Sequence, residues 1–382
     1  MSPRAVREYL DALRPRYGLA GKPKKTLLLD EAERVTHYTR KALIRLLHRR
    51  PGPHRSRRGR PRRYGKTIET ALQQLWHASG HLCSKRLGPF LPELLAALER
   101  HGELRLPARI RQPLQTISPA TIDRLLSPHR RRHVHKPLIL NPATAALRRQ
   151  IPVRTFGDWR DVHPGALQAD LVAHCGETTA GFYLHTLVAV DVATGWTECE
   201  AIWGKGHHRV GAAVHQVRKR LPVPLRELHT DNGAEFLNHI LVPWCRSHGL
   251  RFTRGRPYRK NDQAYAEQRV WTHVRRIVGY DRFSTQAAYT QFNRLYPVLN
   301  LYTNFFQPLR KLSGKCRMGS RVTKQFEVAQ TPYQRLVQSG VLTTEAARSL
   351  TDQYHTLNPI ALRTAIEETL TALWKCADRS LQ

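Results

Sequence analysis

The feature that most constrains the fold of this chain is a nearly continuous apolar run at residues 181–192 (GFYLHTLVAVDV). Such a run predicts a β-strand that is buried on both faces, as in the middle of an α/β sheet. A shorter strand-like run, LQADLV, precedes it at residues 167–172. The segments after it predict alternating helices and strands: residues 206–220, 225–231, 234–247, 251–253 and a helix that starts near residue 262. This order predicts an α/β core with a mixed sheet.

Three acidic residues occupy informative places in this pattern. Asp170 lies inside the first strand-like run, Asp231 ends the run at 225–231, and Glu267 lies on the last predicted helix, with 35 residues between Asp231 and Glu267. Roughly one Asp–Glu pair at this spacing is expected by chance, so the spacing alone is weak. Two strand-borne aspartates and one helix-borne glutamate can form an all-oxygen cage for hard divalent ions. Such a cage suits two-metal phosphoryl transfer.

The residue pattern of the Glu267 helix predicts which face of the helix carries Glu267. Val270, Val274 and Ile277 or Val278 recur at steps of three and four residues and predict the inward face. Glu267 precedes Val270 by three residues, so we expect it on the same face, where a carboxylate is costly unless it is paired or binds a metal. The alternative is a glutamate in the first helical turn that the helix dipole stabilises.

Other acidic residues compete for a metal-binding role. Asp191 is better explained as the cap of a turn that ends at Gly195. Glu235 is expected in the first turn of a helix, where a negative charge is favourable. Asp262 is expected to be the N-cap of the helix that carries Glu267.

The charge balance points to a polyanionic partner. The chain of 382 residues has 63 Lys and Arg against 29 Asp and Glu, a formal charge of +34. Nucleic acid is the default partner of such a chain, and a ribosomal or RNA-packing protein is the alternative, although that class has no need of three acids in an apolar core. The sequence shows no membrane span, secretory leader or nucleotide-binding P-loop, and its six scattered cysteines predict the reduced thiols of a cytoplasmic protein.

The order of elements resembles the RNase H-like core of DDE transposases and retroviral-type integrases. Residues 229–236 (HTDNGAEF) resemble the second-aspartate motif of that family, and residues 256–268 (RPYRKNDQAYAEQ) resemble its glutamate motif. The resemblance covers about residues 166–312 and is closest to transposases of bacterial insertion sequences. It implies a mixed five-stranded sheet with flanking helices, catalytic and metal-binding roles for Asp170, Asp231 and Glu267, and two Mg²⁺ or Mn²⁺ ions. The zinc module at the front of retroviral integrases has no counterpart here.

The segments around this core predict all-α DNA-binding modules in front of it. We expect a helix-turn-helix at residues 1–48, a basic linker at 49–65 and a second helical DNA-binding module at 66–127. We then expect a basic linker at 128–160, the core at 161–315 and a C-terminal helical region at 316–382. In the first module Arg40, Lys41 and Arg45 are free to face DNA, although many small helical pairs look alike.

Two further sets of basic residues are expected to contact DNA. The first, Arg57, Arg58, Arg60, Arg62 and Arg63, surrounds an Arg-Gly-Arg-Pro core that resembles a minor-groove AT-hook, with a phosphate-touching linker as the alternative. The second is Lys260 in the loop before Glu267, with Arg269, Thr272 or His273, and Arg276 on the other face of its helix; a solvated helix face is the alternative.

Together these observations predict a DNA transposase or integrase that cleaves 3′ ends and transfers strands of a mobile element. We expect its partners to be terminal inverted repeats, target DNA and further copies of itself. The alternatives are a non-catalytic regulator derived from a transposase and an RNase H-like nuclease that only hydrolyses.

Overall fold

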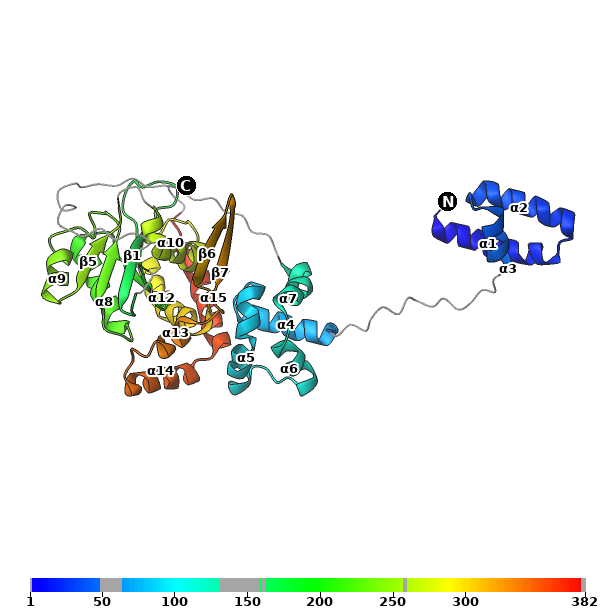
Figure 1. Ribbon diagram of the computed structural model, residues 1–382. Coiled ribbons are helices and arrows are strands. Elements are labelled where there is room, and N and C mark those ends of the chain that lie inside the picture. The colour runs from blue at the N-terminus through cyan, green and yellow to red at the C-terminus, as the bar shows by residue number, and fades with distance from the viewer. Residues whose placement is uncertain (1, 49–63, 131–158, 160–161, 257–259, 379–382) are drawn as a thin grey trace. The chain divides into compact units, whose positions relative to one another are not determined.

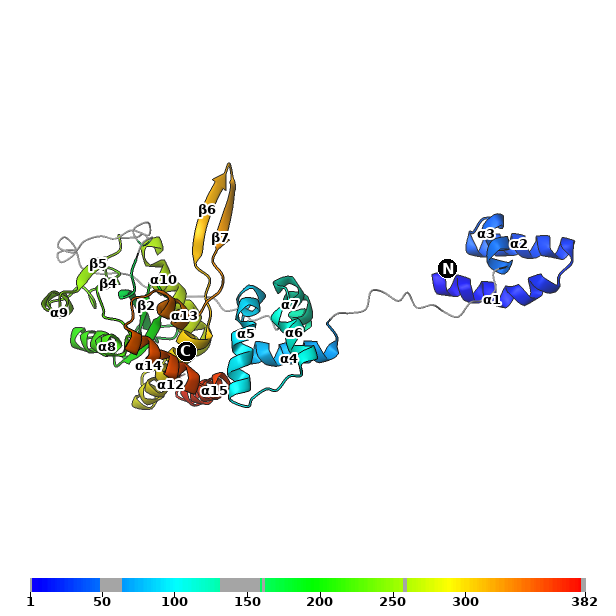
Figure 2. The same cartoon turned by 60° about the horizontal axis from the view of Figure 1, so that its bottom comes forward.

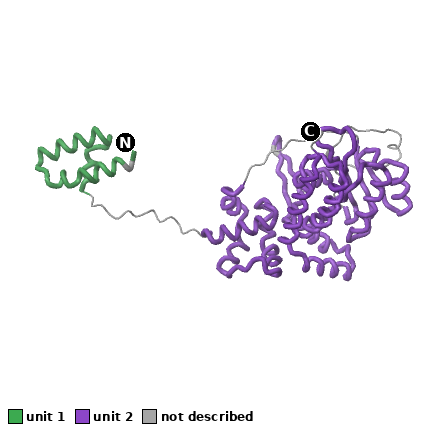
Figure 3. The backbone as a smooth tube through the Cα atoms, turned by 180° about the vertical axis from the view of Figure 1, so that it is seen from behind, with its two compact units in different colours: residues 1–63 green, residues 64–382 purple. Residues whose placement is uncertain are grey.

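The computed structural model describes residues 2–48, 64–130, 159, 162–256 and 260–378. The chain divides into two compact units, residues 1–63 and residues 64–382 (Figure 3). The five arginines between Arg57 and Arg63, and nearly all of the predicted linker 128–160, lie outside the described residues.

The first unit is a bundle of three helices, α1 (Pro3–Leu19), α2 (Lys22–Thr36) and α3 (Arg40–His48). The predicted pair corresponds to α2 and α3, whereas α1 was not predicted. Ser2 caps α1 by accepting a hydrogen bond from the Ala5 amide, and Leu13, Ala32 and Leu43 are among the buried residues of a core that belongs to this unit alone. The unit therefore has the apolar contacts needed to fold by itself.

A five-stranded sheet forms the centre of the second unit (Figure 1). Its order is β3 (Thr197–Ile202), β2 (His185–Asp191), β1 (Ala166–Ala173), β4 (Glu227–Thr230), β5 (Arg251–Arg254). The first three strands are antiparallel, and β4 and β5 run parallel to β1 and to each other. The predicted mixed five-stranded sheet is confirmed, and β2 is buried along its whole length, as its apolar run predicted.

Helices cover both faces of this sheet. On one face α8 (His207–Arg220) and α9 (Leu241–Ser247) pack through residues that include Val214 and Leu241. On the other face lies α12 (Gln286–Phe306), which buries Phe292 and Tyr296. The helix predicted from residue 234 begins only at Leu241. The Asn238 side chain accepts hydrogen bonds from the amides of Ile240 and Leu241, and these side-chain bonds take the place of the backbone bonds of a helix that starts earlier.

The Glu267 helix is irregular. A short 3₁₀ turn (Lys260–Gln263) leads into α10 (Ala264–Arg269), a π-helical stretch (Val270–Arg275) and α11 (Arg276–Val278). A π-helical turn bonds i to i+5 and shifts the side chains on either side of it relative to an α-helical period. This irregularity decides which side chains face inward.

The second helical module consists of α4 (Lys66–Ala78), α5 (Ser84–Arg100), α6 (Ala108–Gln115) and α7 (Pro119–Leu126), followed by a 3₁₀ turn (Ser127–His129). Ser118 caps α7 by accepting a hydrogen bond from the Thr121 amide. The module shares one apolar cluster with α12 and the C-terminal helices. Tyr302 donates a hydrogen bond to the Ala78 carbonyl (2.9 Å) and Asn358 donates to Glu103 (2.6 Å). The module is therefore packed into the unit that contains the sheet.

The C-terminal region begins with a hairpin that the sequence did not predict. Strands β6 (Leu312–Met318) and β7 (Arg321–Phe326) pair antiparallel and project from the body (Figure 2). Six of the seven residues of β6 are exposed, so the strand lacks the alternation of apolar and polar residues that marks a half-buried strand. Helices α13 (Pro332–Gln338), α14 (Thr344–Thr356) and α15 (Pro359–Lys375) follow. None of the described helices is both long and apolar enough to cross a membrane.

Candidate active site

Asp170 and Asp231 lie on neighbouring parallel strands. Asp170 is in the middle of β1, and Asp231 directly follows β4. The register pairs Ala169 with Thr230, so the two aspartates occupy the next position on each strand and lie side by side. The Leu171 amide donates to Asp170 Oδ1 (2.8 Å), and the Gly233 amide donates to Asp231 Oδ1 (2.9 Å). Local backbone thus orients both carboxylates.

The raised pKa of Asp170 indicates that other carboxylates lie close to it. Burial, followed by the negative charges of Asp231, Glu267 and Glu235, raises the pKa of Asp170 to about 7. The Leu171 amide opposes this rise in the pKa. The structure therefore brings the three acids predicted from the sequence into one electrostatic field.

Glu267 itself is exposed, in contrast to the expected inward face. At this end of the helix the inward side chains are Ala266, Arg269 and His273, which are all buried. The α-helical period extrapolated back from Val274 fails because the π-helical stretch lies between. An exposed Glu267 at the edge of the Asp170–Asp231 pair leaves its carboxylate accessible from solvent.

Gln168 connects the strand of Asp170 to the helix of Glu267. It is fully buried, and its Oε1 accepts hydrogen bonds from the backbone amides of Tyr265 (3.1 Å) and Ala266 (3.2 Å). Its Nε2 donates to the Asp262 carbonyl (3.1 Å). This role of Gln168 in connecting strand and helix was not predicted from the sequence. The sequence feature that indicates it is a single amide side chain in an apolar strand, two residues before Asp170.

Asp262 has a different role from the one expected. The first residue before α10 is Gln263, and the expected N-cap function of Asp262 was wrong because its carboxylate accepts instead from the backbone amide (3.1 Å), Nε (2.8 Å) and Nη2 (2.9 Å) of Arg256. Asp262 is completely buried, so this ion pair closes the base of the loop that precedes α10. Residues 257–259 of that loop lie outside the described residues.

The two other candidate metal-binding acids, Asp191 and Glu235, have different roles. Asp191 accepts hydrogen bonds from the amides of Gly165 and Thr194 and from the Thr194 hydroxyl, which confirms its turn-capping role. Glu235 does not lie in the first turn of a helix, because α9 begins at Leu241; it lies in an isolated turn that the Leu237 amide closes by donating to the Gly233 carbonyl (3.0 Å). The Glu235 carboxylate packs directly against Gly233. A Cβ atom at position 233 would lie only 2.6 Å from the carboxylate carbon of Glu235. Glu235 therefore belongs to the acidic cluster around Asp170.

The basic residues predicted to contact DNA lie in different surroundings. Arg40 is ion-paired with Asp30 on α2, whereas Lys41 and Arg45 are exposed on α3. Lys260 lies in the 3₁₀ turn before α10. Arg269 and His273 were wrongly expected on an open outer face; they are buried and, with Thr272 and Arg276, line a pocket.

The acidic cluster offers oxygen ligands only, which is the donor set that hard divalent cations prefer. Within the described residues no three His, Cys, Asp or Glu side chains are close enough to hold an ion as they stand. The raised pKa of Asp170 nevertheless comes partly from neighbouring carboxylates, and a bound divalent cation would reverse that effect. The residues present thus fit Mg²⁺ or Mn²⁺ in chemistry, with Asp170 and Asp231 as holders and Glu267 beside them.

Three comparisons relate the chain to known proteins. A family profile described as "Integrase core domain" matches residues 163–260, a range that includes Asp170 and Asp231 and ends before Glu267. The chain is 44% identical over 335 residues to "Uncharacterized protein y4rM" of Sinorhizobium fredii, covering 86% of this chain and 94% of that protein. The crystal structure of the catalytic core domain of BIV integrase matches at 18% identity over 46% of this chain and 95% of the other, with a TM-score of 0.29.

The chain belongs to the integrase core domain family. Membership suggests activity of the transposase or integrase type and implies DNA as a partner and divalent metal ions as the usual cofactor.

Proposed function

We propose that this protein is a DDE-type transposase that cleaves the 3′ ends of a mobile element and joins them to target DNA. The observation that carries the proposal is the placement of Asp170 and Asp231 at adjacent positions of parallel strands, with Glu267 in the same electrostatic field. A binding-only core has no need of carboxylates that repel each other and repel DNA phosphates.

The chain's own residues prepare this chemistry. Asp170 and Asp231 would hold two Mg²⁺ or Mn²⁺ ions, and Glu267 would complete the second site. Such ions lower the pKa of an attacking water or align a 3′-hydroxyl, and they stabilise the leaving oxygen. The amides of Leu171 and Gly233 fix the two aspartate carboxylates, and Gln168 holds the start of the Glu267 helix against β1.

DNA end recognition is assigned to the first unit. Lys41 and Arg45 are exposed on α3, the second helix of the predicted helix-turn-helix, and such a helix can enter the major groove. The arginines at 57–63 would add sequence-independent or minor-groove contacts. The second helical module and the basic linkers would extend the DNA-binding surface, and copies of the chain would assemble on paired terminal repeats.

A strand-transfer assay tests the proposal. Duplexes that end in the inverted repeats flanking the coding sequence are incubated with the full chain, Mg²⁺ and a target plasmid. Asp170→Asn, Asp231→Asn and Glu267→Gln are each expected to lower cleavage and joining by about a thousandfold or more, because each removes a metal-binding charge at nearly constant shape. Asp352→Asn, at an exposed position on α14, is the matched control.

The outcomes also separate the alternatives. Cleavage without joining would favour a nuclease, and end binding without any chemistry in the unmodified protein would favour a regulator. Near-normal activity in any one of the three variants would remove that residue from the proposed site.

A further inference from the structure

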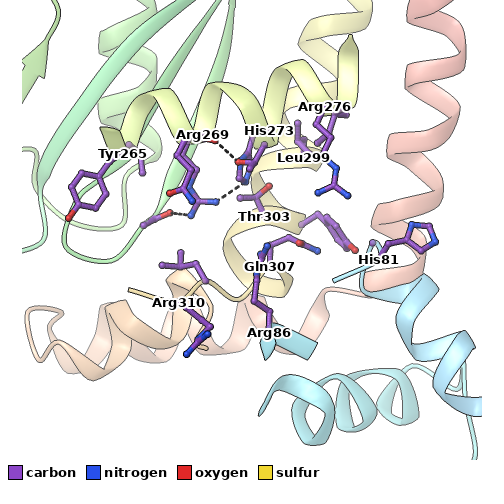
Figure 4. A pocket seen from close by; sticks show the side chains of 18 of the residues that line it. His81, Arg86, Tyr265, Arg269, His273, Arg276, Leu299, Thr303, Gln307 and Arg310 are labelled. Carbon is purple, nitrogen blue, oxygen red and sulfur yellow. Dashed lines mark hydrogen bonds between the residues drawn. The ribbon is translucent and has the colours of Figure 1, made fainter. Parts of the chain in front are cut away.

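A large pocket lies beside α10 and the π-helical stretch that follows it (Figure 4). Its volume is about 900 Å³, and its walls come from the α4–α5 turn, α10 to α12, the base of the β6–β7 hairpin and α15. Glu267 is exposed while Arg269, two residues later, lines this pocket. The short helix α10 therefore carries both Glu267 and part of the pocket wall.

The lining is strongly basic. Six cations contributed by five segments of the chain face the pocket: Arg86, Arg269, Arg276, Arg310, Lys311 and Arg363. Among the described lining residues Glu367 is the one acid, and it is hydrogen-bonded to Arg363 (2.8 and 2.7 Å). One carboxylate that is already paired leaves most of this positive charge unbalanced within the pocket.

The buried cations have neutral partners. Arg269 donates to the Gly195 carbonyl (2.9 Å) and contacts His273 Nε2 (3.0 Å), and Arg86 donates to the Pro308 carbonyl. Burial, followed by the charge of Arg86, lowers the pKa of Arg269 to about 9. Burial, followed by the charges of Arg363, His77 and Arg276, lowers the pKa of His81 to about 4. Cations that are buried and repel one another are costly until an anion joins them.

Aromatic side chains lie between these cations. Tyr265, Phe326 and Trp374 line the pocket, and Phe326 and Trp374 are each 43% exposed. The Trp374 indole donates to the Val278 carbonyl (2.9 Å), which fixes the plane of its ring. Basic side chains that follow a backbone, with aromatic rings on which bases can stack, are what proteins use to bind single-stranded nucleic acid.

We propose that this pocket binds an unpaired stretch of the DNA strand next to the phosphodiester that the acidic cluster handles. The inference rests on the proposed function for the identity of the polyanion. A duplex is too wide to enter a pocket of this volume, whereas one or two nucleotides with their phosphates fit between the arginines and the rings. An opened DNA end could then pass around the Glu267 helix, with its backbone held at the pocket.

The test is fluorescence anisotropy with the full chain and EDTA present, so that binding is measured without chemistry. The probes are labelled oligothymidine and a duplex of equal length. The test variant, Arg276→Gln with Arg310→Gln, removes two charges from the pocket. The matched control, Arg294→Gln with Arg348→Gln, removes two charges from exposed positions on α12 and α14 outside the pocket.

The pocket variant is expected to weaken oligothymidine binding about tenfold and to flatten the slope of log K against log salt by about 1.4, since each phosphate contact on a single strand contributes about 0.7. Duplex binding should change less than twofold, and the control should change neither affinity more than twofold. Phe326→Ala should weaken oligothymidine binding about fivefold through lost stacking. Equal losses in the pocket variant and the control would overturn the proposal, as would equal losses for both probes or equal competition by polyglutamate.

The result can be separated from that of the proposed function. Asp170→Asn with Asp231→Asn should bind oligothymidine at least as tightly as the unmodified chain, because the change removes negative charge near the DNA. If strand transfer is never observed but the pocket variant alone loses oligothymidine binding, the pocket assignment stands and only the transposase proposal fails.

Discussion

The side chain of Gln168 on β1 accepts a hydrogen bond from the backbone amide of Ala266 at 3.2 Å. Gln168 lies two residues before Asp170, and Ala266 directly precedes Glu267. One buried amide group therefore sets the position of the helix that carries the third acid relative to the strand that carries the first. Both the oxygen and the nitrogen of the Gln168 amide are hydrogen-bonded. The contact therefore sets the orientation of the Glu267 helix as well as its distance from β1.

Gln168→Leu is expected to lower strand transfer about tenfold to a hundredfold and to destabilise the fold. The substitution is close in volume, but it leaves two buried amides without a partner, each costing about 1–3 kcal/mol. Urea unfolding and strand-transfer assays on the same preparation measure both effects. Gln216→Leu, at an exposed position on α8, is the control, and equal loss in the two variants would contradict a positioning role for Gln168.

Asp170 is expected to make the metal-free protein less stable as the pH rises. Its folded-state pKa is raised from 3.8 to about 7, so between these values the folded state holds a proton that the unfolded state has lost. The free energy of unfolding therefore falls as pH rises from about 4 to about 7. At about pH 8 in EDTA, Asp170→Asn should be more stable than the unmodified protein by on the order of 1 kcal/mol. Urea unfolding at about pH 5 and pH 8 tests the sign, and a variant that keeps the full pH dependence would refute the assignment to Asp170.

Mg²⁺ and Mn²⁺ are expected to support cleavage, whereas Ca²⁺ should support little. Ca²⁺ accepts longer and more variable oxygen distances, so it should misplace the attacking and leaving oxygens while still offsetting the charges of Asp170 and Asp231. Ca²⁺ should therefore permit DNA binding without product. Full cleavage in excess EDTA would rule out the metal-dependent reaction.

Residues 1–63 are expected to fold as a separate fragment, whereas a cut at residue 127 is not expected to yield two stable parts. The first unit has a core of its own, but α4 to α7 share an apolar cluster with α12 and α15. Separating residues 64–127 from the rest would expose this shared surface, and apolar area removed from water contributes about 25 cal/mol per Å². Circular dichroism and thermal unfolding of the fragments 1–63, 64–382, 1–127 and 160–382 test this, and cooperative unfolding of 160–382 alone would contradict it.

The sequence by itself was sufficient for the strands that carry Asp170 and Asp231 and for the buried β2, because each of these is a pattern within a few residues. Strand β3 and the order of the strands in the sheet were not contained in these patterns. The sequence was also sufficient for the turn cap at Asp191, whose partner Thr194 lies three residues further along the chain. These features follow from local geometry, in which side-chain periodicity reports which face is buried.

The tertiary structure alone decided which helix faces surround the site. Gln168 meets Ala266 across 98 positions of sequence. Likewise, Arg269 is buried where its side chain donates to the Gly195 carbonyl, 74 positions away in the sequence. The exposure of Glu267 depends on a π-helical stretch, and the β6–β7 hairpin is exposed along most of its length, so neither leaves a simple period in the sequence. Contacts between segments far apart in the chain are set by packing of whole elements, which the local pattern of any one element does not contain.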